Sequence, residues 1–134
     1  MQLSESELTI ALTGVAKATL AAQNKDIRKG KVDVEDVWRD LGGYGRYQVL
    51  DSLGGQVLPV LASLPDVPRV HGERPSYGMS QIKAAVEEHV GDEGGRLRRK
   101  ATVLARVALV QAALAQLPPY VDPDADPDVA QAPE

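Results

Sequence analysis

Apolar residues recur at intervals of three and four along most of the first 117 positions, which is the spacing of one face of an α-helix. The first such run comprises Leu8, Leu12, Val15, Thr19 and Ala22. The run predicts a helix that starts at Ser4 and ends near Asn24. Its start has the sequence of a capping box, because Ser4 and Glu7 are spaced so that each side chain can accept a hydrogen bond from the other's backbone N–H.

Glycines and prolines divide the next part of the chain into short segments. The predicted segments are a basic connector at 25–31 and helices at 34–41, 44–53 and 56–64. Asp33 is expected to cap the first of these helices. The glycine pairs at 42–43 and 54–55 are expected to end two of them. Pro59 would then lie in the first turn of its helix, where no backbone hydrogen bond is lost.

The segment 65–79 contains several prolines and glycines and predicts a long loop, which is a feature often tied to function or to a partner. A helix is expected from Ser80 to about Val90, followed by a glycine-rich break at 91–95. The last helix is expected at about 96–117. Its apolar stretch is interrupted by Arg106 and is shorter than the roughly 20 residues that a membrane span requires.

Two apolar rows run along this last predicted helix. The first row is Val103, Val107, Val110, Leu114 and Leu117. The second row is Leu97, Ala101, Leu104 and Ala108. One row suffices for a helix that packs on a single core, so two rows predict burial on more than one side. The helix is therefore expected to be either central in the bundle or part of a dimer interface.

These elements predict an all-α fold: an irregular or orthogonal bundle of five to six helices in one domain at 1–117. No segment is strongly typical of a β-strand. The remaining stretch, 118–134, is rich in proline and aspartate and predicts a disordered tail. This tail holds five acidic residues and no base, which leaves 14 acids against 15 bases in the helical part. The charge balance of the helical part thus argues neither for nor against a nucleic-acid partner.

Composition excludes several kinds of chemistry. The chain has no cysteine, so disulfides, thiolate catalysis and cysteine-ligated zinc are excluded. Neither of its two histidines, His71 and His89, lies at a usual metal-ligand spacing. The alternating aspartates at 122–128 lack the glycine and glutamate of a calcium loop. No catalytic residue, metal or cofactor is predicted. Because residues 1–20 do not resemble a signal peptide, we expect a cytoplasmic protein.

The leading functional hypothesis is a non-enzymatic interaction or assembly module, either a homo-oligomer or the partner of another protein. It follows from the missing catalytic pattern and from the surplus apolar surface of the last helix. If that helix forms a dimer, the first row is expected at the interface, through Val103, Val107, Val110 and Leu114.

The alternative hypothesis is DNA binding through a degenerate helix-turn-helix at 33–53. Arg46 and Gln48 would face the groove, and the residues expected to contact phosphates are Arg96, Arg98, Arg99 and Lys100. The motif match is incomplete, because the position where the two helices touch most closely would be Trp38, which is large. A third hypothesis is a ligand site formed by the 65–79 loop with His71, Arg74 and Tyr77.

Overall fold

The computed structural model describes residue 1 and residues 3–122, and this part of the chain is helical with no strand. The helices are α1 (Glu5–Gln23), α2 (Lys25–Arg28), α3 (Val34–Asp40), α4 (Gly42–Ser63), α5 (Met79–Glu87) and α6 (Gly95–Gln116). The predicted all-α class and helix number are confirmed. Most of the predicted tail, from residue 123 onward, lies outside the described residues.

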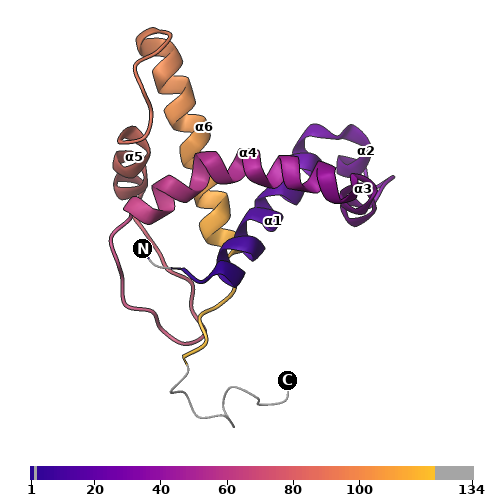
Figure 1. The fold of residues 1–134 in the computed structure, drawn as a ribbon, viewed down its shortest axis with the longest axis horizontal. Coiled ribbons are helices and arrows are strands. Elements are labelled where there is room, and N and C mark those ends of the chain that lie inside the picture. The colour runs from indigo at the N-terminus through magenta and orange to yellow at the C-terminus, as the bar shows by residue number, and fades with distance from the viewer. Residues whose placement is uncertain (2, 123–134) are drawn as a thin grey trace.

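The three longest helices, α1, α4 and α6, cross one another instead of running side by side. In Figure 1, α4 lies across the molecule, while α1 and α6 cross it and α5 lies beside the first half of α6. The short helices α2 and α3 lie near the beginning of α4, at the far end from α5. Since α6 contacts α1, α4 and α5, it is the helix on which the other long elements converge.

The start of α1 forms as its sequence predicts. The Glu7 N–H donates to Ser4 Oγ and the Ser4 N–H donates to Glu7 Oε1, each over 3.1 Å, which completes the capping box. The predicted cap of α3 is also present, with the Glu35 N–H donating to Asp33 Oδ1 over 2.9 Å. The connector at 25–31, by contrast, contains the one-turn helix α2. The Asn24 side chain nucleates that turn by accepting hydrogen bonds from the N–H groups of Asp26 and Ile27.

The predicted break at Gly54–Gly55 is wrong, because α4 runs through it as one helix of 22 residues. Two glycines in a helix interior cost about 1 kcal/mol each relative to alanine. The continuous helix offsets that cost by burying side chains on both sides of the pair, at Leu53, Val57, Val60 and Leu61. Pro59 consequently lies inside α4, where its ring is exposed to solvent. Gly55, whose carbonyl loses its helical partner there, is exposed as well, so water can satisfy that carbonyl.

The boundaries of the last two helices differ slightly from those expected. Gly78, and not Ser80, precedes the first turn of α5, and its N–H donates to Gln81 Oε1 over 2.9 Å. That helix ends at Glu87, short of Val90. The bounds of α6 agree with the sequence prediction to within one residue.

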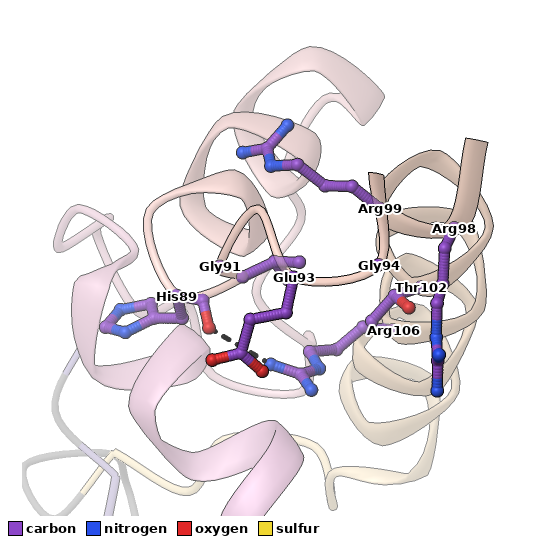
Figure 2. Close-up of a pocket in the computed structure, with 9 residues that line it drawn as sticks. His89, Gly91, Glu93, Gly94, Arg98, Arg99, Thr102 and Arg106 are labelled. Atoms are coloured by element: carbon purple, nitrogen blue, oxygen red, sulfur yellow. Dashed lines mark hydrogen bonds between the residues drawn. The ribbon is translucent and has the colours of Figure 1, made fainter. Parts of the chain in front are cut away.

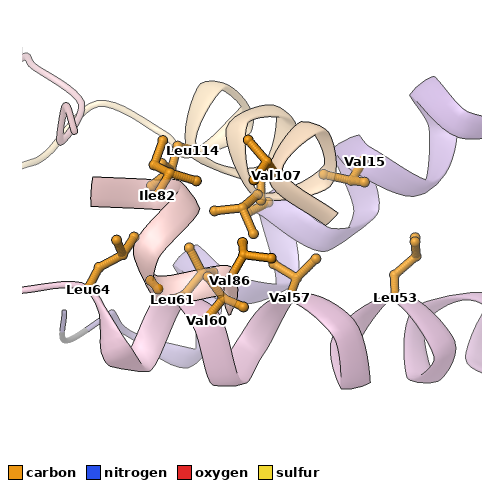
Figure 3. Packing of buried hydrophobic residues seen from close by; sticks show 14 of the residues in the cluster. Val15, Leu53, Val57, Val60, Leu61, Leu64, Ile82, Val86, Val107 and Leu114 are labelled. Carbon is orange, nitrogen blue, oxygen red and sulfur yellow. The ribbon is translucent and has the colours of Figure 1, made fainter. Parts of the chain in front are cut away.

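Small aliphatic side chains form the core (Figure 3). Its largest contribution comes from α6, and no polar or charged residue is buried in the described part of the chain. The largest side chains that are almost completely inaccessible to solvent are those of Val15, Val57, Val60, Leu64, Val86, Val110 and Leu117. Valine and alanine let crossing helices approach closely, which explains how a domain without phenylalanine fills its interior.

Arg69, in the loop that joins α4 to α5, contacts both α1 and the chain that follows α6. The Arg69 Nη2 lies 2.7 Å from Glu7 Oε2 on α1, and its guanidinium lies 4.8 Å from the ring centre of Tyr120. Backbone hydrogen bonds add to this clamp: the Gly72 N–H donates to the Tyr120 carbonyl over 2.8 Å, and the Tyr120 N–H donates to the Glu73 carbonyl over 2.9 Å. The loop therefore ties the start of α1 to the chain that follows α6.

The clamp makes the stability of the fold sensitive to acid. Burial alone would raise the pKa of Glu7, but the hydrogen bonds from Arg69 and Ser4, with the charge of Arg69, outweigh it and hold that pKa below 4.5. A carboxyl whose pKa is lower in the folded state stabilises the fold above its unfolded pKa. That contribution is lost as the pH falls through the folded pKa.

We expect Glu7→Gln to lower the free energy of unfolding at neutral pH by about 1 kcal/mol, because Arg69 loses its charged acceptor. The difference from the unchanged chain should shrink as the pH falls below the ordinary carboxyl range. Urea unfolding at a series of pH values measures both effects. Glu5→Gln, an exposed change in the same helical turn, is the control and should be close to neutral. Equal effects of the two changes would contradict the role given to the clamp.

The continuity of α4 is tested by replacing its glycines with alanine. A Cβ at Gly55 would meet no atom within 4 Å, so Gly55→Ala should stabilise the chain by about 0.5–1 kcal/mol through its higher helix propensity. The matched change Gly42→Ala should destabilise it, because Gly42 has a φ of +73°. Chemical denaturation compares the two variants. Destabilisation by Gly55→Ala would argue for a break in the helix at this position.

Candidate functional site

The most conspicuous surface of the protein is a face of α6 that no other described element covers. Leu97 is 83% exposed and Leu104 is 57% exposed, which is unusual for leucines on a regular helix. The exposed positions Ala101, Ala105 and Ala108 lie around them. We call this face the α6 stripe and define it as Leu97, Ala101, Leu104, Ala105, Ala108, Gln111 and Ala115.

The stripe carries no charge along four turns of the helix. Between residues 101 and 116 the only charged residue of α6 is Arg106, which lines a cavity with the loop at 89–94 on another side of the helix. At one end the stripe continues onto α5, where the Sδ of the exposed Met79 accepts from Gln111 Nε2 over 3.7 Å. At the other end lie the exposed bases Arg96 and Lys100. Leu104 also borders a cavity that Lys83 and Glu87 of α5 line, so charged residues lie beside the stripe on α5 as well as at the start of α6.

The residues predicted for a dimer interface occupy a different place. Val103, Val107, Val110 and Leu114 are each 7% exposed or less and belong to the core of the single chain. They pack inward because α1, α4 and α5 all converge on that side of α6. These four residues are therefore not available on the surface of the single chain, and the row of α6 that stays exposed is the second one, at Leu97, Ala101, Leu104 and Ala108.

The four basic residues at the start of α6 differ in their surroundings. Arg99 is paired locally, with its Nε 3.1 Å from Asp92 Oδ1 and its Nη1 3.8 Å from Glu87 Oε2. The other three, Arg96, Arg98 and Lys100, are exposed, and none of them forms an ion pair within the described part of the chain. This end of α6 therefore keeps unneutralised positive charge.

The predicted DNA-reading segment is separated from this basic group. Arg46 donates from Nη1 to the carbonyls of Arg39 at 2.9 Å and Trp38 at 3.4 Å, so it satisfies the last turn of α3. Gln48 is exposed on α4. In Figure 1, α3 and the beginning of α4 lie at one end of the molecule and the start of α6 lies at the other. The structure does not bring Arg46 and Gln48 onto one surface with Arg96, Arg98, Arg99 and Lys100.

The polar residues of the loop at 64–78 are engaged with the backbone. His71 Nδ1 accepts from the Asp122 N–H over 3.1 Å, and Arg74 Nε donates to the Leu117 carbonyl. Tyr77 Oη donates to the Pro65 carbonyl over 2.6 Å. Burial, followed by the charge of Asp66, raises the pKa of Tyr77, which keeps this donor protonated. These three side chains fasten the loop. Arg74 and Tyr77 also line one cavity of about 340 Å³ with residues of α5 and α6, but His71 is not among its lining residues.

One histidine lies beside a serine, His89 Nε2 being 2.6 Å from Ser63 Oγ. The Ser63 hydroxyl also donates to the Pro59 carbonyl over 3.1 Å, which is the ordinary bond of a serine within a helix. A hydroxyl that donates to a carbonyl is not delivering its proton to the imidazole. The pair therefore lacks the arrangement of an activated nucleophile.

Two other kinds of site are absent from residues 1 and 3–122. No group of three or more histidine or acidic side chains there is placed to hold a metal ion. None of the helices described has the length and apolarity needed to span a bilayer.

Comparison with protein-family models, with curated proteins and with solved structures finds no match for this chain.

Proposed function

We propose that this protein is a self-associating assembly module, in which the α6 stripe of one copy packs against the α6 stripe of a second copy. The observation that supports this most strongly is the pair of exposed leucines, Leu97 and Leu104, on an uncharged face of four turns. Burying one leucine side chain is worth about 1.5–3 kcal/mol. A face of this kind, left in water, is typical of a surface that binds another protein.

The spacing of the stripe fits a helix pair. Positions 97, 101, 104, 108, 111 and 115 alternate steps of four and three, which is the seam of two helices packed at a shallow angle. Alanine at alternate positions allows the two backbones to approach closely. The same residues could not form a broad ligand pocket, because they lie on one convex helix surface.

An antiparallel arrangement of the two α6 helices, centred near residue 106, pairs large side chains with small ones and separates the basic residues of the two copies. It sets Leu104 opposite Ala108 and Leu97 opposite Ala115, so that each large side chain meets a small one. It also keeps the two basic helix starts apart, at opposite ends of the pair. A parallel pair would bring Arg96 and Lys100 of both copies together and would repel. Antiparallel helices further oppose their dipoles, with each basic start near the partner's negative helix end.

We expect Leu104→Glu to convert the dimer into single chains, because the pair would have to bury a charge beside an alanine. Sedimentation equilibrium or light scattering measures the mass, and circular dichroism checks that the helices remain. Ile10→Glu is the matched control: Ile10 is exposed at 46% on α1, away from the stripe, so this change should leave the mass of the dimer unaltered. An unchanged chain that sediments as a monomer at every concentration would overturn the proposal.

The orientation of the pair is tested by cysteine cross-linking, which is clean here because the chain has no cysteine of its own. In the antiparallel pair, Ala101 of one copy faces Gln111 of the other. A mixture of Ala101→Cys and Gln111→Cys chains should therefore form a mixed disulfide on mild oxidation, since such bonds need Cα atoms within about 7 Å. Each variant alone should cross-link poorly. Efficient cross-linking of Ala101→Cys with itself would indicate a parallel pair.

A further inference from the structure

A second site lies on a different side of α6 from the stripe, and it does not depend on self-association. Figure 2 shows a cavity between the start of α6 and the loop that follows α5, which three arginines line. Its volume is about 330 Å³, within the range of small-ligand sites. The polar side chains that line it are His89, Glu93, Arg98, Arg99, Thr102 and Arg106.

The three arginines in this cavity differ in how far their charge and their donor groups are satisfied. Arg106 donates from Nη1 to the His89 carbonyl over 3.2 Å, but its Nε is shielded from solvent and has no hydrogen-bond acceptor. A buried donor without an acceptor is costly, and the Arg106 side chain would have to shift for its Nε to reach an anion in the cavity. Arg98 forms no ion pair within the described residues. The charge of Arg99 is neutralised by Asp92 and Glu87, although its buried Nε, 3.1 Å from Asp92 Oδ1, also makes no hydrogen bond.

The backbone beside the cavity favours negative charge as well. The helix α6 starts after Gly94, at a φ of 82°, with no side chain capping its first turn and no acidic residue in it. Its first N–H groups have no intrahelical acceptor, although that of Gly95 donates to the Asp92 carbonyl over 3.3 Å, and the helix dipole adds positive potential there. A Cβ on Gly94 would lie 2.2 Å from Arg98 Cδ, so glycine at this position is what lets the Arg98 side chain lie against the loop.

We infer that this cavity binds the phosphate group of a small molecule. Guanidinium groups bind phosphate through paired charge-assisted hydrogen bonds, and Arg98, Thr102 and Arg106 line the cavity from positions four residues apart along α6. Glu93 is the one acidic lining residue, and it forms no ion pair with either arginine in the described part of the chain. Its carboxylate opposes an anion, so its charge limits the affinity.

The inference is tested with inorganic phosphate as the probe, by following the amide signals of Gly94 and Gly95 in the ¹⁵N-labelled full chain. We expect saturable shifts at these two residues in the unchanged protein. Arg98→Gln should weaken binding about tenfold or more, because one charge-assisted pair is lost. Arg106→Gln should weaken it similarly. Arg98 makes no hydrogen bond in the described structure, so its variant should fold normally even if Arg106→Gln loosens the loop.

Two matched variants distinguish phosphate binding in this cavity from nonspecific attraction to a basic surface. Lys100→Gln removes one charge from the same helical turn, but Lys100 lines a different cavity and should leave phosphate binding nearly unchanged. Glu93→Gln should tighten binding severalfold by removing the opposing charge. Equal weakening by Lys100→Gln and Arg98→Gln, or weaker binding by Glu93→Gln, would overturn the inference. Amide shifts in the unchanged protein that do not saturate with phosphate would also overturn the inference.

The source of the phosphate is distinguished by a second titration, with a nucleoside diphosphate and its parent nucleoside. Tighter binding of the diphosphate than of inorganic phosphate would identify an organic phosphate as the ligand, and equal or weaker binding would identify the free anion. Both results support a phosphate site. Equal binding of the uncharged nucleoside would contradict it. Because the stripe lies on another side of α6, Leu104→Glu should leave this binding intact, and failure of either proposal leaves the other standing.

Discussion

Burial of the valine row of α6 against α1, α4 and α5 is the interaction on which the rest of the structure depends. It brings three crossing helices onto one surface, and it does so without any aromatic or polar residue at its centre. Val107 and Val110 are small, so the helices that cross here can approach one another closely. The many van der Waals contacts of this close packing stabilise the fold, although no single side chain is large. The clamp at Arg69 then joins the start of α1 to the chain beyond α6 and closes the domain.

The same packing fixes the rotation of α6 about its axis and thereby assigns the other sides of the helix. One side, the α6 stripe, has no cover and no charge, which suits a second apolar surface. Another side holds Arg98 and Arg106 against the loop at 89–94, which suits an anion. One helix thus carries a core, a proposed self-association surface and a proposed phosphate site. The last two can act together because they do not share side chains.

The helix ends that depend only on neighbouring residues could be predicted from the local sequence. The capping box of Ser4 and Glu7, the Asp33 cap and the extent of α6 could be predicted because each depends on hydrogen bonds or periodicity within a few positions. The predicted break at Gly54–Gly55 failed for the opposite reason. Glycine lowers helix propensity by only about 1 kcal/mol, and burial of Leu53 and Val57 by distant helices exceeds that.

The sequence by itself determined that α6 has two apolar rows and a basic start, since both are read directly from residue order. It could not determine which row faces inward: Val103 and Leu104 are adjacent and equally apolar, and only contacts with α1, α4 and α5 decide between them. Likewise, Arg46 and Arg106 are merely basic in the sequence. Their roles depend on the Arg39 and His89 carbonyls, which tertiary folding brings within hydrogen-bonding distance. Periodicity specifies that a face is apolar, whereas packing specifies what covers it.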